Sequence, residues 1–236
     1  MTSAAQDAVE SRLIRLSYGV EKANTYMLTA ADGSAVLIDA CSPELVSELK
    51  NRRLEPFAVI LTHEHCDHIW GLNALRKAYP EMHLIAHSRC SQAIGNPRDN
   101  KARQYHVYMA LRYGSAYRRN PAQATDYCCE KADICFDAAY QFSWKGLSFH
   151  CVHTPGHSPG SAMITVNGAF VFSGDTILPQ ADPFLKLDGG NALAYEKIAK
   201  PIVDSLPDEA MVFPGHGDCF TMKEWRRRHN GEYAGA

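Results

Sequence analysis

A dense group of side chains that can bind metal ions follows a short apolar segment at residues 58–61. The group consists of His63, His65, Asp67 and His68. Imidazole nitrogens and carboxylate oxygens suit zinc, iron or manganese. On an extended or turning backbone, residues two apart project to the same side, so His63 and His65 can bind one ion. Asp67 and His68 can then face a second ion. A helical zinc-protease motif is excluded, because HExxH requires a histidine where this chain has Asp67.

Three later segments place a further ligand directly after an apolar run. They are HTPGH ending at His157, SGD ending at Asp175 and PGH ending at His216. Groups that do chemistry concentrate at strand ends, because a rigid sheet positions them while loops leave access for a substrate. We therefore expect these side chains to join the first group at one rim.

Three neighbours of the ligands are expected to have other roles. Glu64 is expected to point outward or to support a ligand, and Cys66 to be a spectator thiol. His153 is expected to pack or to support a ligand.

Short strands and helices must position these motifs. Strands are predicted at 13–16, 25–29, 35–38, 58–61 and 83–86, and again at 147–152, 162–166, 169–172 and 211–213. Helices are predicted at 42–52, 69–79 and 192–205, the first with Ser42 as its cap and Pro43 at its first position. Two halves that each combine strands with helices predict one layered α/β domain over residues 1–236.

Between the two halves lies a long stretch, at about residues 88–145, that is rich in Tyr, Arg and Asn. A helix is predicted within it, because Val107, Ala110 and Leu111 recur at helical spacing. Long excursions in compact domains are often lids or binding loops. The aromatic side chains can equally pack the insertion onto the main domain, and both interpretations stay open.

Composition limits the partners of the chain. With 46% hydrophobic and 21% charged residues and a net charge of −2, it resembles a soluble globular protein without a basic field for nucleic acid or anionic lipid. The basic group at residues 223–228 is interpreted as a solvated helix face. We expect a small-molecule substrate, no nucleic acid and no membrane; the number of subunits is left open.

The expected location is the cytoplasm. Residues 1–12 lack the charged start and apolar run of a secretory signal. The eight cysteines are scattered along a chain too long for a small disulfide scaffold, so reduced thiols are expected.

Taken together, the HxHxDH cluster and the three later motifs resemble the metallo-β-lactamase fold superfamily, from about Asn24 to about Gly217. The resemblance implies a four-layer αββα sandwich with a helical insertion between its halves. It also implies two divalent ions, foremost zinc, with iron or manganese as alternatives. By this resemblance His63, His65 and His157 hold one ion, Asp67, His68 and His216 hold the other, and Asp175 bridges them.

Asp175 and the stretch HTPGHSPGS at 153–161 look most like the glyoxalase II branch, which cleaves thioesters, whereas class B β-lactamases lack this bridging aspartate. Two features differ from that branch. The residues after His216 hold no counterpart of the helical region that grasps glutathione, and TILPQ at 176–180 replaces a Gly-Arg-x-Asp pattern. The expected substrate is therefore another thioester, carried by coenzyme A, a carrier protein or another small thiol.

The expected mechanism is hydrolysis by a hydroxide that two metal ions activate. Two cations lower the pKa of a shared water from 15.7 towards roughly 7. Asp67 and Asp175 are the expected catalytic carboxylates, which hold this water. A thiolate or alkoxide can leave onto a metal, but an amide nitrogen needs a proton donor. Three alternatives stay open: a lactonase, a mononuclear iron persulfide dioxygenase, and a non-catalytic binding module, against which the complete ligand set argues.

Overall fold

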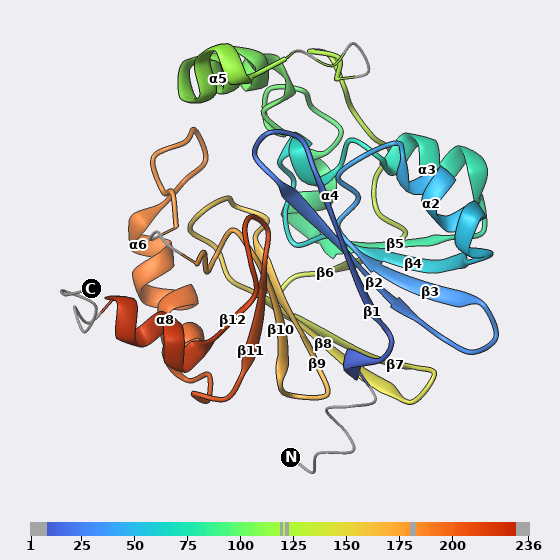
Figure 1. Ribbon diagram of the computed structural model, residues 1–236. Helices are drawn as coiled ribbons and strands as arrows, with labels where there is room; N and C mark the ends of the chain where they lie inside the picture. Colours follow the sequence, from blue (N-terminus) through green and yellow to red (C-terminus); the bar gives the residue numbers. More distant parts are fainter. Residues whose placement is uncertain (1–8, 119, 121–122, 180–182, 230–236) are drawn as a thin grey trace.

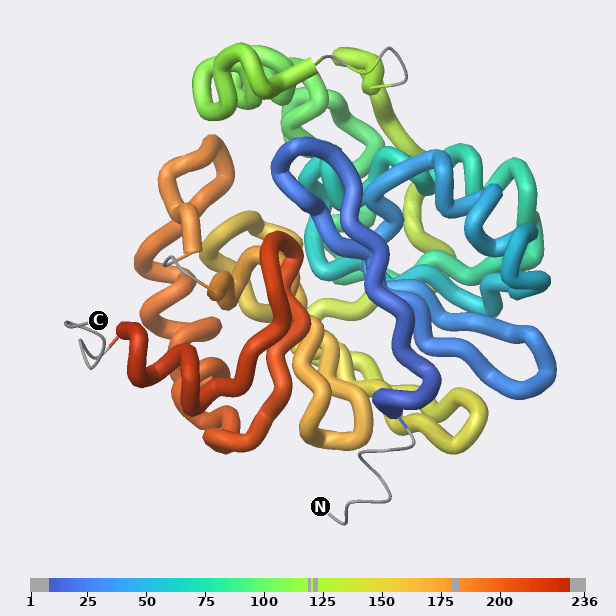
Figure 2. The backbone as a smooth tube through the Cα atoms, viewed as in Figure 1, coloured from blue at the N-terminus to red at the C-terminus, as the bar shows by residue number. Residues whose placement is uncertain are grey.

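Two six-stranded sheets pack face to face in the protein, as a computed structural model shows for residues 9–118, 120, 123–179 and 183–229 (Figure 1). The first and second halves of the chain lie side by side, coloured blue to green and yellow to red in Figure 2. Residues 1–8, which enter the prediction of location, fall outside the described ranges. None of the helices among the described residues has the length and apolar content needed to cross a membrane.

The first sheet has strand order β1-β2-β3-β4-β5-β6. Its strands are β1 (Leu13–Tyr18), β2 (Ala23–Thr29), β3 (Ser34–Ile38), β4 (Glu55–Ile60), β5 (His83–His87) and β6 (Ile134–Phe136). The strands from β3 to β6 are parallel. Parallel neighbours need crossover connections. The helix α2 (Leu45–Arg52) connects β3 to β4, and α3 (Leu72–Ala78) lies in the connection from β4 to β5.

The second sheet has strand order β12-β11-β10-β9-β8-β7. Its strands are β7 (Ala139–Trp144), β8 (Leu147–His153), β9 (Ala162–Val166), β10 (Phe170–Gly174), β11 (Met211–Pro214) and β12 (Phe220–Thr221). The parallel pair β10 and β11 is connected through α6 (Ala192–Ala194), η3 (Tyr195–Ala199) and α7 (Lys200–Asp204). The chain then enters α8 (Met222–His229), which carries the basic group.

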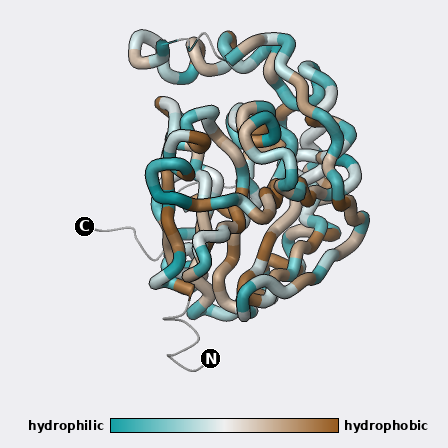
Figure 3. The backbone as a smooth tube through the Cα atoms, turned by 90° about the vertical axis from the view of Figure 1, so that its right-hand side faces the viewer, coloured by the Kyte–Doolittle hydropathy of each residue, from teal (hydrophilic) through white to brown (hydrophobic). Residues whose placement is uncertain are grey.

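Alternation of apolar side chains explains the layers. In β3, Val36 and Ile38 face the other sheet, whereas Ala35 and Leu37 face the helices α2 and α3. Both faces of the strand are buried, as expected for a parallel strand covered on both sides. Figure 3 colours the backbone by hydropathy, with brown, hydrophobic stretches running through the body of the molecule. The predicted αββα architecture is confirmed, because helices cover the outer face of each sheet.

The segment outside both sheets is narrower than the predicted insertion at 88–145. It ends at residue 133, because β6 and β7 are strands of the two sheets. It contains α4 (Ser88–Ala93), α5 (Ala102–Tyr113) and η2 (Gly114–Ala116). The helix predicted from Val107 and Leu111 is α5, but these side chains are 63% and 83% exposed. Tyr105 and Met109 form its buried face instead. The apolar residues that predicted the helix therefore lie on its solvent-exposed face.

Two stacked histidines hold the connection between the sheets. The rings of His87, at the end of β5, and His153, at the end of β8, lie 3.8 Å apart. His87 Nε2 donates to the carbonyl of Asp137, and its Nδ1 accepts from the backbone of Arg89. His153 Nε2 donates to the carbonyl of Pro159. Protonating His87 would therefore place a second N–H against the Arg89 amide.

This stack is expected to make stability fall in mild acid. Burial and the neighbouring His153 lower the pKa of His87 from 6.5 to about 4, and burial lowers that of His153. The unfolded chain then binds more protons than the folded one between these pH values, so stability present above pH 6.5 is lost toward pH 4. In His153→Gln, whose amide can still donate to Pro159, the melting temperature should fall less between pH 7 and 4.5. His83→Gln, at an exposed position, should behave like the parent; equal acid sensitivity of all three would contradict the assignment.

Candidate metal centre

Four strand ends meet at one rim of the sandwich. The loop after β4 carries His63 and His65 and continues into η1 (Cys66–His68), while His157, Asp175 and His216 follow β8, β10 and β11. Backbone hydrogen bonds tie these ends together. The Ala162 amide donates to the Thr62 carbonyl at 2.7 Å, and the Gly215 amide donates to the Gly174 carbonyl at 2.8 Å. The rim therefore joins ligands from both sheets.

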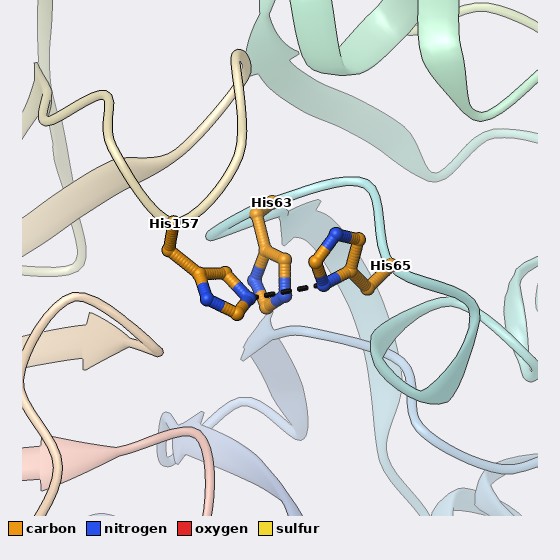
Figure 4. Close-up of side chains that lie close together, drawn as sticks. All are labelled: His63, His65 and His157. Carbon is orange, nitrogen blue, oxygen red and sulfur yellow. Dashed lines mark hydrogen bonds between the residues drawn. The ribbon is translucent and has the colours of Figure 1, made fainter. Parts of the chain in front are cut away.

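His63, His65 and His157 form the first group, with their nearest ring nitrogens all within 4.8 Å of one another (Figure 4). His65 Nδ1 lies 3.0 Å from His157 Nε2. Two ligands of one tetrahedral zinc ion lie about 3.4 Å apart when each bond is about 2.1 Å. The three rings are buried and converge at a spacing close to that of a zinc site.

Asp67, His68 and His216 form the second group. His216 Nε2 lies 3.3 Å from Asp67 Oδ2 and 3.4 Å from His68 Nε2. Asp175 lies between the two groups. Its Oδ2 is 3.5 Å from His157 Nε2 and 3.6 Å from His216 Nε2, and its Oδ1 is 3.6 Å from His68 Nε2. The structure thus brings all seven sequence-predicted ligands together, with one carboxylate beside both groups.

The residues at this rim fit divalent cations. His63 Nε2 and Asp175 Oδ1 are buried without a hydrogen-bond partner among the described residues. Such atoms are rare in proteins unless an ion or water binds them. Gly215 leaves room here, because a Cβ atom at this position would lie 2.2 Å from Asp175 Oδ1. The centre therefore combines inward-facing lone pairs with space for an ion.

Outer hydrogen bonds fix which nitrogen each histidine presents. Nδ1 of His68 donates to Asp39 at 2.8 Å, that of His157 to the Phe184 carbonyl at 3.0 Å, and that of His216 to the Glu21 carbonyl at 3.0 Å. Each ring therefore turns its Nε2 toward the centre, the orientation that metal-binding histidines require. His65 differs, since its Nδ1 points at the first group.

Asp39 is a functional residue that the sequence-based set lacks. It is 2% exposed, follows β3 and adopts φ 60°. Its Oδ1 accepts from the Thr62 amide and its Oδ2 from the Thr62 hydroxyl, each at 2.7 Å. Since that hydroxyl is donated to Asp39, its oxygen can accept from His63 Nδ1 at 3.1 Å. One carboxylate thereby orients His63 and His68 in the two groups. The signal for it was a carboxylate directly after an apolar strand.

Charge differs between the two groups. Burial would lower the pKa of His68, but Asp39, Asp67 and Asp175 outweigh it and raise that pKa to about 10. Burial opposes but Asp175 and Asp67 likewise raise the pKa of His216 to about 9. Burial lowers the pKa of His63, with neighbouring imidazoles adding to the effect. The carboxylate-rich group therefore favours a positive charge, and the all-histidine group presents neutral rings.

Glu64 faces the protein interior rather than outward. It is 1% exposed, and its carboxylate accepts from the Ser158 hydroxyl at 2.9 Å and the Gly160 amide at 3.3 Å. It therefore supports a ligand, because these contacts hold the turn that carries His157.

Glu64→Ala is expected to weaken metal binding by about tenfold, the lower end for partners that support ligands. The cause would be a looser His157 turn. Metal affinity measured by competition with a chromogenic chelator tests this, with the exposed Glu81→Ala as control. Unchanged affinity in Glu64→Ala would show that the turn carrying His157 keeps its conformation without Glu64.

A cavity of about 570 Å³ opens above the ligands. Its floor includes His65, Asp67, His157, Asp175 and His216. One wall is α5, whose residues 104, 105, 108, 109, 112 and 113 line it, a spacing of three and four that defines one helix face; Lys101, just before the helix, lines it as well. Within the insertion, Tyr105 and Met109 pack on Trp70 and also border the cavity. A second cavity of about 440 Å³ contains none of the seven ligands, so the chemistry belongs to the first.

A sequence model of the metallo-beta-lactamase superfamily matches residues 18–216 of the chain. The chain belongs to the metallo-β-lactamase superfamily. Among relatives in this superfamily, an uncharacterized protein of Mycobacterium tuberculosis is 30% identical over 229 residues, which cover 89% of this chain and 92% of that protein. A hydroxyacylglutathione hydrolase of Xanthomonas euvesicatoria is 26% identical over 198 residues, covering 81% of this chain and 59% of that enzyme. The predicted likeness to glyoxalase II is thereby confirmed.

Two crystal structures show the same fold. The B3 metallo-beta-lactamase BLEG-1 superposes with a TM-score of 0.75 and 27% identity, covering 94% of this chain and all of that one (100%). TTHA1623, in a di-iron-bound form, gives a TM-score of 0.70 and 26% identity over 91% of this chain and 98% of that one. The superfamily, together with the clustered His and Asp residues, supports binding of divalent metal and leaves the identity of the metal open.

Proposed function

We propose that the protein is a cytoplasmic hydrolase that uses two divalent metal ions, foremost zinc, to cleave a thioester of coenzyme A, a carrier protein or another small thiol. In this proposal His63, His65 and His157 hold one ion, and Asp67, His68 and His216 hold the other. Asp175 carries the proposal, because its carboxylate lies within 3.6 Å of histidines from both groups.

When bound, the ions would polarise a carbonyl and acidify a water. Asp67 and Asp175 are the proposed catalytic residues. Their Oδ2 atoms lie 3.3 and 3.6 Å from the same atom, His216 Nε2, so both can accept hydrogen bonds from a water at this end of the cavity. Burial would raise the pKa of Asp67, but His68 and His216 lower it, so the carboxylate stays ionised. It can therefore accept a hydrogen bond from the water and orient it.

Cleavage of a thioester requires no proton donor for the leaving group from the surrounding residues. A thiol has a pKa near 8.5, so a thiolate can leave without first receiving a proton. An amine leaving group needs a donor placed at the nitrogen. The match to a hydroxyacylglutathione hydrolase adds support, since that name describes a thioesterase.

The test is turnover of a substrate panel by purified protein loaded with zinc, iron or manganese. The panel holds an acyl coenzyme A, a lactone, a persulfide with oxygen uptake recorded, and a chromogenic cephalosporin, included because BLEG-1 is a B3 metallo-beta-lactamase. Thioester cleavage should stop with chelator, return with metal, and be lost in His65→Ala but not in the exposed control His83→Ala.

Chelator-insensitive cleavage would contradict the metal centre. Ring opening of the lactone without thioester cleavage would favour the lactonase. Oxygen consumption with one iron per chain would favour the dioxygenase.

A further inference from the structure

Three cationic side chains line the cavity above the metal ligands. Lys101 directly precedes α5, Arg112 comes from the cavity face of α5, and Arg228 comes from α8. The helix α5 lies across the top of the molecule in Figure 1, above the segment that leads into α6. Lys101 and Arg112 are eleven positions apart, which corresponds to roughly 16 Å along a helix. Positive charge thus lies at α5 and α8, while the carboxylates that border the cavity, Glu21, Asp67, Asp175 and Asp218, come from other segments.

The two arginines are held by uncharged partners. Arg112 donates to the hydroxyls of Tyr108 at 3.1 Å and Tyr113 at 3.3 Å, both uncharged partners. Arg228 donates to the carbonyl of Pro179 at 3.1 Å. Within the described part of the chain, no carboxylate forms an ion pair with any of the three. Nearby arginines outside the cavity differ, since Arg226 pairs with Asp208 and Arg98 with Asp188.

Apolar side chains line the same cavity. Met109, Leu178, Phe184 and Leu187 border it together with the three cations. A ligand that fits this lining has an apolar part and an anionic part. Phosphate and carboxylate groups are the anions that arginine binds best, through paired charge-assisted hydrogen bonds.

We infer that Lys101, Arg112 and Arg228 bind an anionic group of the substrate that lies away from the scissile carbonyl. This inference rests on the proposed thioesterase function and names its substrate class: an extended thioester that carries phosphate or carboxylate groups. The anion can belong to the thiol carrier or to the acyl chain. A spread of positive charge over roughly 16 Å suits an extended anionic carrier better than a compact one.

Matched thioesters test the inference. Butyryl coenzyme A carries phosphates, butyryl N-acetylcysteamine is neutral, and succinyl N-acetylcysteamine carries a carboxylate on the acyl side. We expect a charged thioester to exceed the neutral one in kcat/KM by about tenfold per cation used, because hydrogen bonds between charged groups are stronger than those between neutral groups. Preference for the coenzyme A ester would place the anion on the carrier, and preference for the succinyl ester would place it on the acyl chain.

Variants assign the effect to residues. The ratio of charged to neutral kcat/KM should fall about tenfold or more in Arg112→Gln and in Arg228→Gln. The exposed neighbours Arg103→Gln on α5 and Arg227→Gln on α8, which do not line the cavity, should keep the ratio. Binding of coenzyme A by calorimetry gives a second readout, and Kd should rise in the same two variants and with salt.

Two outcomes separate this inference from the function on which it rests. Cleavage of neutral and charged thioesters at equal rates, with equal ratios in all variants, would overturn the anion site and leave the thioesterase intact. Absence of any thioester cleavage would contradict the thioesterase. In that case coenzyme A binding that weakens in Arg112→Gln and Arg228→Gln, but not in the controls, would still support the anion site.

Discussion

Asp175→Asn is expected to lower kcat/KM for the thioester by about 10³-fold, because metal stabilisation is worth several kcal/mol and each 1.36 kcal/mol is tenfold. The amide removes the charge that faces His68, His157 and His216 at 3.5–3.6 Å. Metal content after zinc loading should fall from about two ions per chain toward one. Steady-state kinetics and elemental analysis of the same samples give both values.

The control for this variant is Asp126→Asn, which changes an exposed aspartate remote from the ligands in sequence. Circular dichroism of both variants checks that the fold survives. Full activity of a folded Asp175→Asn protein would remove this carboxylate from the centre and, with it, the main support for a two-ion mechanism.

Asp39→Asn is expected to weaken metal binding by about 10–100-fold, the range for partners that orient ligands. Asp39 accepts from Thr62 through Oδ1 and from Thr62 and His68 through Oδ2. Asparagine can place its oxygen at the Thr62 amide only by turning its NH₂ group toward His68 Nδ1. The ring must then move its proton to Nε2, which blocks the atom that faces Asp67 and His216.

Two measurements separate this tautomer effect from simple destabilisation. In zinc-treated samples, nitrogen-15 spectra should show His68 protonated at Nδ1 alone in the parent and at Nε2 in the folded Asp39→Asn protein. Metal titration should show loss of the ion held by Asp67, His68 and His216. Asp32→Asn, on an exposed turn, is the control. If His68 keeps its proton on Nδ1 and metal affinity does not change, Asp39 serves stability alone.

Strand ends could be predicted because each ligand directly follows an apolar run, and a run of this kind has few uses other than a buried strand. The same logic reaches Asp39, which follows β3, but one carboxylate without a histidine beside it carries no ligand pattern. Glu64 was out of reach, since its partners Ser158 and Gly160 are more than ninety positions away.

In the insertion, the helix could be predicted but its buried face could not. Val107 and Leu111 have helical spacing, yet the side chains that α5 buries are the aromatic and sulfur-containing Tyr105 and Met109. Periodicity therefore identified the helix but not its inward face. The edge strands β6 and β7 were missed because their side chains alternate between buried and exposed only over short spans, which a polar stretch conceals.

The ligands come from both sheets: four follow β4, and three follow β8, β10 and β11. Neither half of the chain can complete either group alone, because His157 and His216 come from the second half and His63, His65, Asp67 and His68 from the first. An ion would therefore bind only after the two sheets have packed together, and it would stabilise only this folded state. Metal binding is thus coupled to folding. In a cell that is short of metal, the protein should have a shorter lifetime.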